Sequence, residues 1–405
     1  LGSTASMLLE MKEVTQSVLQ AVKGIEDPVE RDRKTEARIK ALEEEIEKKR
    51  DDYRVYIRPM YKGKKYYQFV FQRFEDVRLV FAPPLSIGKY GGDTDNWMWP
   101  RHTGDFTFLR AYMAPDGSGR KYHPDNIPVK SPNYLRITKD HLKENDFTFI
   151  MGFPGSTNRW RTSNSVAWNL NYGYPDRIQN YKETIDIIDA VGDKSKEGKI
   201  RLASIHSGLH NAMKNYQGNI DGMEKTHFLA RKKAFEKDFL EFIESKPELE
   251  KEYGTVLAQI HKQYKTLEET RLRENVLSMF GYQSGTLASV AVRIYDTVAE
   301  REKPEDKRDP GFSEKQVDRT KDRLQYSYYN YYHDADVALL TRVLEKAAAL
   351  PEDQRIKGLS DLPVETGQKY SDYVQSMLDQ TKLKDPDFAK TLFNKTVAEL
   401  EALND

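Results

Sequence analysis

The stretch GGDTDNWMWPRHTGDF, residues 91–106, concentrates side chains that can do chemistry. Asp105 lies just before the alternating apolar segment FTFLRAY. A Ser-His-Asp triad needs a carboxylate at such a strand edge, where it accepts the Nδ1–H of a histidine and sets the tautomer of the ring. A Gly-Asp pair before a strand is more often only a turn. The pattern around Asp105 alone therefore favours a turn over a triad.

Asn96, Trp97 and Arg101 form a second set in the same stretch. A carboxamide oxygen accepts hydrogen bonds from an ammonium group, and an indole ring supplies a flat wall with cation–π attraction. Arg101 can hold the carboxylate of Asp93 or Asp95 in a bidentate pair and so fix the loop. Together these residues predict a loop that holds the free amino terminus of a peptide.

The histidines offer weaker candidates. His102 stands three residues before Asp105, too close across a glycine turn to be its triad partner, so we expect a structural role for it. His206 and His210 have the i, i+4 spacing of a two-histidine metal face on a predicted helix. Ser207 occupies the position of the glutamate in a metalloprotease HExxH motif. Ordinary histidines on a helix surface are favoured, and we expect no metal and no cofactor.

Two further motifs have simpler interpretations than a functional site. GFPGST, residues 152–157, shares its glycines with a phosphate-binding loop but lacks the Lys-Ser/Thr ending, so a tight turn is favoured. The aromatic run YSYYNYYH, residues 326–333, indicates helix–helix packing first and a binding surface second.

Composition excludes several classes of function. The 405 residues contain 64 Lys+Arg and 64 Asp+Glu, so no basic excess points to nucleic acid. No apolar run approaches the roughly 18 residues that a transmembrane helix needs. Zero cysteines exclude disulfides, thiolate metal sites and a cysteine nucleophile.

The first part of the chain mixes predicted helices and strands. Residues 7–50 have helical spacing of apolar residues, and residues 53–83 form short runs rich in Tyr, Val and Phe that are split by turn residues. The strand pattern continues in GDFTFLRAYM, residues 104–113, and in DFTFIMGFPG, residues 146–155. Several short strands with Gly and Pro turns predict an antiparallel sandwich or barrel.

After about residue 160 the period becomes helical. Apolar residues recur at three/four spacing over residues 177–245 and 247–303, and KPEDKRDPGF, residues 303–312, is a predicted loop. Further helices are expected after it, two shorter ones around residues 369–381 and 387–403. The sequence therefore predicts an α+β multidomain fold, with a β-rich part over residues 1–158 and an all-helical part over residues 159–405.

Three segments of the chain closely resemble the bacterial dipeptidyl-peptidase 7 and 11 family of serine exopeptidases. They are DVRLVFAPPLSIGKYGGDTDNWMWPRHTGDFTFLRAY, MGFPGSTNRW and LHNAMKNYQGNIDGM, at residues 76–112, 151–160 and 209–223. The resemblance extends over essentially the whole chain, is strongest at residues 70–230 and is weaker beyond about residue 300. It implies a chymotrypsin-like double β-barrel with a large helical domain inserted between barrel strands.

The resemblance also implies roles for particular residues. Asp105 matches the triad aspartate of the family. Asn96 and Trp97, with Asn211 from the helical part, match the residues that bind the α-amino group of the substrate. Arg101 belongs to the same loop pattern and supports it. The histidine and serine of the triad fall outside the matched segments, which indicates an internal fragment that is inactive alone.

The family further implies an oligopeptide substrate with a free amino terminus, a homodimer, and a periplasmic or cell-surface location. A rival interpretation is a non-catalytic peptide-binding or scaffold protein that keeps the amino-terminal pocket and has lost the triad. The presence of Asp105 argues against such a loss, because a protein that has lost the triad does not need this aspartate. A helical assembly protein gives no reason for NWMWPRHTGD.

Overall fold

The computed structural model describes residues 3–150, 158, 160–304, 307–312, 314–362 and 368–403. The chain divides into two compact units, which we call the β-rich unit and the helical unit. The β-rich unit comprises Leu1–Gly92, Pro100–Phe153 and Pro304–Pro310. The helical unit comprises Asp93–Trp99, Pro154–Lys303 and Gly311–Asp405.

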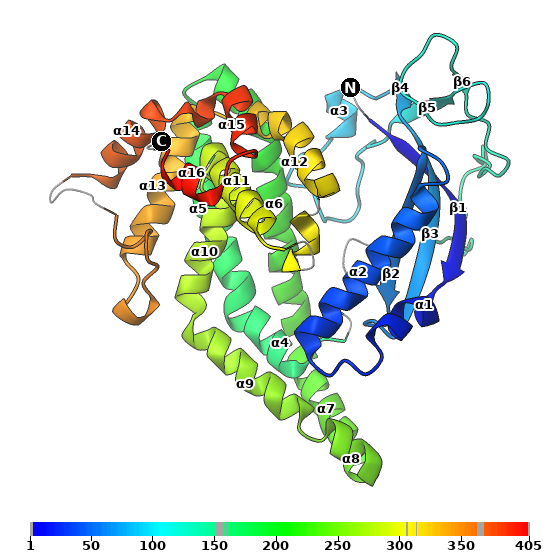
Figure 1. Ribbon diagram of the computed structural model, residues 1–405, viewed down its shortest axis with the longest axis horizontal. Coiled ribbons are helices and arrows are strands. Elements are labelled where there is room, and N and C mark those ends of the chain that lie inside the picture. Colours follow the sequence, from blue (N-terminus) through cyan, green and yellow to red (C-terminus); the bar gives the residue numbers. More distant parts are fainter. Residues whose placement is uncertain are drawn as a thin grey trace. The chain divides into compact units, whose positions relative to one another are not determined.

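The first sheet of the β-rich unit is antiparallel and has the strand order β1-β3-β2 (Figure 1). Its strands are β1 (Ala5–Glu13), β2 (Tyr53–Met60) and β3 (Lys65–Phe74). The central strand β3 is rich in Tyr, Phe and Val and alternates between buried and less buried positions, as expected for a strand with one face in a core.

Two helices, α1 (Thr15–Leu19) and α2 (Pro28–Glu47), cover one face of this sheet. Helix α2 begins where Asp27 accepts a hydrogen bond from Glu30 N at 2.7 Å, with a proline in the first turn. Val18, Ile57 and Tyr66 form the small core between helices and sheet.

Carboxylates of α2 protect the edge of this sheet. Glu43 accepts a hydrogen bond from Ile57 N at 2.7 Å, and Glu47 accepts one from Val55 N at 3.1 Å. Both amides belong to β2, an edge strand whose outer N–H groups face away from β3. The helix thus satisfies backbone donors that an exposed edge would offer to another chain.

The second sheet is smaller and has the order β4-β5-β6. Its strands are β4 (Asp76–Phe81), β5 (Phe108–Met113) and β6 (Ile127–Pro128). The short helix α3 (Leu85–Gly88) lies between β4 and β5 in the sequence. The strands predicted within residues 53–83 are confirmed, and the segment at 104–113 is a strand from Phe108 onward.

The predicted helix at residues 7–50 is wrong in its first part, because Ala5–Glu13 is strand β1. Met7, Leu8 and Met11 have helical spacing, and a bulge between Leu8 and Glu10 breaks the alternation that would reveal a strand. Antiparallel pairing with β3 outweighs the helix propensity of Leu, Met and Glu.

The strand predicted at residues 146–155 is wrong over its described part. Asp146–Ile150 forms no strand, and the side chains of Phe147 and Ile150 are 89% and 98% exposed. Alternation of apolar residues is not sufficient here, because a strand also needs a neighbouring strand that pairs with its backbone N–H and C=O groups. Residues 151–155 lie outside the described residues.

The helical unit confirms the helical periodicity that the sequence shows after residue 160. Helices α5 and α6 lie side by side (Figure 1). The α-helices of this unit are α4 (Ser163–Trp168), α5 (Tyr174–Gly192), α6 (Lys196–Lys225), α7 (Phe228–Glu244), α8 (Pro247–Tyr253), α9 (Val256–Glu269), α10 (Arg271–Gln283), α11 (Thr286–Glu302), α12 (Glu314–Ser327), α13 (His333–Ala348), α14 (Tyr370–Gln380), α15 (Pro386–Leu392) and α16 (Val397–Glu401).

The largest hydrophobic core lies among helices α11 to α16, where Phe393 and Val374 are fully buried. Asp336 of α13 is the main polar feature beside this core. Its carboxylate accepts hydrogen bonds from Thr286 N at 2.9 Å and from Leu287 N at 2.8 Å, so it caps the first turn of α11. Burial raises the pKa of Asp336 to about 6, although these two hydrogen bonds act in the opposite direction.

The predicted α+β class is confirmed by two antiparallel sheets and a large set of helices. In the described part of the chain, no helix has the length and apolar character needed to cross a membrane.

Candidate functional site

The loop Asp93–Trp99 is held against helix α6 within the helical unit. Lys214 of α6 supplies most of the contact, because its ammonium group donates to three backbone carbonyls of the loop. Its Nζ lies 2.8 Å from Thr94 O and 3.2 Å from Asn96 O, and it also donates to Asp93 O. One charged side chain thereby satisfies carbonyls that a short loop cannot pair internally. Asp93–Trp99 lies with the helices, whereas the predicted boundary assigned it to residues 1–158.

Asn211 lies three residues before Lys214 on α6 and joins the two candidate residues of the loop. Asn96 Nδ2 donates to Asn211 Oδ1 at 2.9 Å. Trp97 Nε1 donates to the backbone carbonyl of Asn211 at 3.2 Å. The three residues that the sequence assigned to one amino-terminal pocket therefore meet at one place.

The backbone of Trp97 has an unusual conformation. Its φ is 64°, in the left-handed region that a bulky side chain rarely adopts. The turn is closed by a hydrogen bond from Met98 N to Asp95 O at 3.0 Å. Trp97 and Trp99 remain 60% and 91% exposed, although burying an indole would stabilise the fold. A strained turn that displays two exposed indoles is typical of a binding loop.

The arrangement can bind an ammonium group. Asn211 Oδ1 accepts one hydrogen bond from Asn96, and a carboxamide oxygen has two lone pairs, so it has capacity for a second donor. The indole of Trp97 adds a π face that attracts a cation. An acceptor oxygen beside a π face is what the amino terminus of a peptide requires.

Asp105 lies in the β-rich unit, three residues before β5 begins at Phe108. The residues just before it are anchored to the region of α3. Gly104 N donates to Ile87 O at 3.0 Å, and Thr103 Oγ1 donates to Tyr90 O at 2.8 Å. A Cβ at Gly104 would lie 2.7 Å from Ile87 Cγ2, so the close approach requires glycine. These contacts fix the backbone on the amino-terminal side of Asp105.

The carboxylate of Asp105 is exposed, whereas the sequence suggested a partly buried one at a strand edge. Strand pairing ends before it is reached, because the partner of Phe108 is Phe81, the last residue of β4. Pro83 and Pro84 follow, and proline cannot continue a ladder. Phe106 packs on the rings of Phe81 and Phe108, with centroids 5.9 and 5.7 Å away.

Arg101 and His102 are exposed residues of the β-rich unit. The support of the loop by Arg101 stays a prediction. GFPGST, at residues 152–157, lies outside the described residues. In the aromatic run at 326–333, Tyr328 is buried and donates from its hydroxyl to Leu383 O at 2.7 Å, as expected for helix packing.

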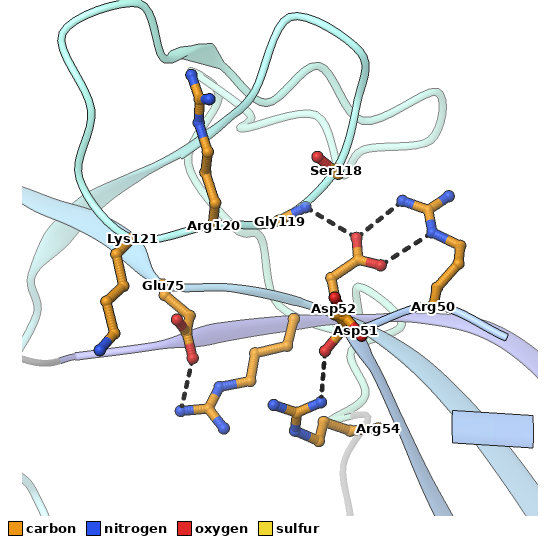
Figure 2. Close-up of a pocket in the computed structure, with 10 residues that line it drawn as sticks. Arg50, Asp51, Asp52, Arg54, Glu75, Ser118, Gly119, Arg120 and Lys121 are labelled. Atoms are coloured by element: carbon orange, nitrogen blue, oxygen red, sulfur yellow. Dashed lines mark hydrogen bonds and ion pairs between the residues drawn. The ribbon is translucent and has the colours of Figure 1, made fainter. Parts of the chain in front are cut away.

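A charged pocket in the β-rich unit is centred on Asp52 (Figure 2). The buried carboxylate accepts hydrogen bonds from Arg50, Gln72 and Gly119 N. Burial alone would raise the pKa of Asp52, but these hydrogen bonds together lower it. A Cβ at Gly119 would lie 1.8 Å from Arg73 O. Asp52 joins the turn containing Gly119 to the first sheet, so we assign this cluster to the fold.

Two residues at the loop escaped the sequence analysis as contributors to a site. Lys214 was not considered, although it follows His206 and His210 at intervals of four on α6 and so shares their face. Asp93 was considered only as a partner of Arg101. The structure places its carboxylate near the two histidines, with potential ligand atoms of all three residues within 4.8 Å of one another.

Comparison with known proteins finds relatives that are named as dipeptidyl-peptidases. Dipeptidyl-peptidase 7 of Capnocytophaga gingivalis is 42% identical over 240 residues, covering 58% of this chain and 33% of the relative. The Asp/Glu-specific dipeptidyl-peptidase of Shewanella putrefaciens is 31% identical over 353 residues, covering 86% of this chain and 47% of the relative. The chain thus spans a third to a half of the length of these bacterial relatives.

The fold is also shared with a solved structure. Porphyromonas endodontalis DPP11, in complex with the dipeptide Arg-Glu, superposes with a TM-score of 0.71 at 22% identity. The match covers 98% of this chain and 61% of that one. The family model described as Peptidase S46 matches residues 2–405. The chain therefore belongs to the peptidase S46 family.

Proposed function

We propose that this chain is part of a serine exopeptidase that releases dipeptides from the free amino termini of oligopeptides. The observation that carries the proposal is the meeting of Asn96 and Trp97 with Asn211 at one ammonium-binding place. The names of the relatives from Capnocytophaga gingivalis and Shewanella putrefaciens support the reaction class. Because the chain spans a third to a half of those relatives, the proposal concerns the whole protein.

In the proposed reaction a serine attacks the carbonyl carbon of the second substrate residue. A histidine takes the serine proton and then protonates the leaving amine, while Asp105 orients the histidine and stabilises the imidazolium. No residue of this chain is assigned as the serine or the histidine. The chemistry needs no cofactor.

Asn96, Trp97 and Asn211 set the length of the product. They hold the substrate ammonium at a fixed distance from the serine, so that only the second peptide bond reaches it, which is a positioning effect. Arg101 supports the loop. We infer a double β-barrel that includes residues 1–158 and a helical cap at 159–405, with the Asp93–Trp99 loop working together with the cap.

One peptide in two forms tests the function. The whole protein is incubated with a free and an N-acetylated oligopeptide, and products are identified by mass spectrometry. The proposal predicts dipeptides from the free form only, with release impaired in Asp105→Ala and Asn96→Ala. Binding of the free peptide without cleavage of either form would instead favour a non-catalytic peptide-binding protein.

We also infer a periplasmic or cell-surface location and a homodimer, both supported only by the family resemblance. Cell fractionation tests the location. Sedimentation velocity of the whole protein tests the dimer, and a single monomeric species would contradict it.

A further inference from the structure

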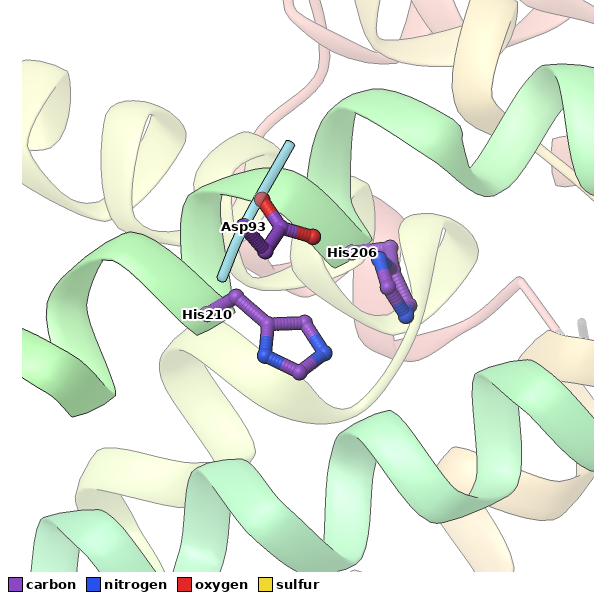
Figure 3. Close-up of side chains that lie close together, drawn as sticks. All are labelled: Asp93, His206 and His210. Atoms are coloured by element: carbon purple, nitrogen blue, oxygen red, sulfur yellow. The ribbon is translucent and has the colours of Figure 1, made fainter. Parts of the chain in front are cut away.

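Asp93, His206 and His210 bring three metal-ligating side chains together in the helical unit (Figure 3). His206 and His210 are one helical turn apart on α6, with ring centroids 4.5 Å apart. Asp93 reaches them from the loop, more than a hundred residues earlier in the sequence. A helix and a loop that are distant in sequence thus contribute to one cluster.

We propose that these three residues bind a divalent transition-metal ion such as Zn²⁺. Two imidazole nitrogens and one carboxylate oxygen are ligands that Zn²⁺ commonly takes, and three protein ligands leave a fourth position for water. Bond lengths of about 2.0–2.1 Å place tetrahedral ligands about 3.3 Å apart. The present spread is up to 4.8 Å, and the exposed Asp93 side chain closes it by rotation when the ion binds.

Asp189 strengthens the case from a third element. This residue of α5 has its Oδ1 3.1 Å from His206 Nε2. Metal-bound histidines usually donate their other ring N–H to a carboxylate, which fixes the ring and raises its basicity as a ligand. Asp189 is placed to do this for His206 when the Nδ1 atom of the ring binds the ion. Two positive charges lie near the carboxylates of Asp93 and Asp189: Lys214, which donates to Asp93 O, and Lys199, which interacts with Asp189 and forms an ion pair with Asp193 at 2.8 Å. The three carboxylates of Asp93, Asp189 and Asp193 outnumber the two ammonium groups and favour a cation.

The ion would brace the loop that carries the candidate pocket. Asp93 is three residues before Asn96, and His210 is adjacent to Asn211. Lys214 already holds the backbone of the loop, and a metal bond through the Asp93 side chain would add a second attachment. This consequence for the pocket rests on the proposed function, whereas metal binding itself does not.

A cobalt titration tests the site directly. The purified chain, without a histidine tag and stripped of metal, is titrated with Co²⁺, whose visible absorption reports coordination by nitrogen and oxygen. We expect about one ion per chain, displaced by Zn²⁺. His210→Ala and Asp93→Asn lose the absorption band, and Asp189→Asn weakens binding by about 10–100-fold. His141→Ala, which removes an exposed histidine from the β-rich unit, leaves binding unchanged.

Absence of a band in the wild-type chain, or equal binding by His210→Ala, would overturn the proposal. Circular dichroism of the metal-free variants separates loss of a ligand from loss of the fold. Hydrogen exchange of residues 93–99 then tests whether the ion stabilises the loop. We predict that Zn²⁺ slows this exchange in wild type and does not change it in His210→Ala. Peptide binding is measured separately, so a failure of the proposed exopeptidase activity leaves the metal result standing.

Discussion

Asn96 Nδ2 donates a hydrogen bond to Asn211 Oδ1 over 2.9 Å, which joins two residues 115 positions apart in the sequence. The bond orients both carboxamides, because each amide has one donor side and one acceptor side. It leaves the Asn211 oxygen with capacity for a further donor, beside the indole of Trp97. This geometry is the one that the proposed binding of a substrate ammonium group requires.

Replacing Asn211 by alanine should weaken peptide binding. A hydrogen bond to a charged group contributes about 1.5–3 kcal/mol, so we expect kcat/KM for free peptides to fall by about 10–100-fold, largely through KM. Asn219→Ala is the matched control, since Asn219 lies on α6 and donates to Asn215 O of its own helix. Steady-state kinetics of the whole protein measure both. Equal kinetics for the two variants would remove Asn211 from the pocket.

Lys214→Met should loosen the loop without unfolding the helix. The variant keeps an unbranched side chain, one heavy atom shorter, and loses the donors to Thr94 O, Asn96 O and Asp93 O. We expect amide hydrogen exchange in residues 93–99 to accelerate by about tenfold or more, since charged hydrogen bonds are lost. Lys225→Met, at an exposed position near the end of α6, should leave that exchange unchanged. Unaltered exchange in Lys214→Met would contradict the assigned role.

Gly104→Ala should impair chemistry more than binding. The added Cβ would lie 2.7 Å from Ile87 Cγ2, so the Ile87 side chain or the backbone before Asp105 must shift, and we predict that the backbone does. A displacement of about 1 Å near a catalytic group can cost about 10²-fold in rate. We expect kcat to fall while KM changes little. The double variant Gly104→Ala/Ile87→Ala removes the contact and should recover much of kcat, and a lack of recovery would mean that steric displacement is not the cause.

Asp336 should make the helical unit less stable as pH rises. Its pKa is raised to about 6 in the folded state, above its unfolded value, so its contribution is full at low pH and lost as pH rises through about 6. Between about pH 5 and pH 7.5 we expect wild type to lose about 1 kcal/mol relative to Asp336→Asn. Urea unfolding followed by circular dichroism measures the difference.

The matched control for this pH dependence is Asp334→Asn, an exposed aspartate in the first turn of the same helix. Its difference from wild type should stay nearly constant over the same pH range. A constant difference for Asp336→Asn as well would show that its carboxylate does not titrate in this window.

Sequence periodicity predicted most helices and the central strands, because their cores are built from regularly spaced apolar residues such as those of β3 and α13. It failed at Ala5–Glu13, where pairing with β3 and a bulge outweigh local propensity. It failed again at Asp146–Ile150, whose alternation of apolar residues does not produce a strand. In both segments the outcome depends on a partner that the local sequence does not contain.

The candidate site was predictable only in part. Asn96 and Trp97 were proposed from their residue types, Asn211 was added through a family resemblance, and the structure brings the three together. Lys214 and the cluster at Asp93 were missed, because their roles depend on where the loop lies on α6. The side-chain spacing on α6 was visible in the sequence, but the loop position was not.

The most direct test measures binding of the peptide amino terminus separately from peptide cleavage. Binding of a free and an N-acetylated peptide to the catalytically impaired Asp105→Ala form of the whole protein is measured by calorimetry, alone and combined with Asn211→Ala. We predict that Asp105→Ala binds the free peptide about as tightly as wild type and the acetylated one at least about tenfold more weakly. Asn211→Ala should abolish that preference. Equal affinity of Asp105→Ala for both peptides would contradict the amino-terminal clamp.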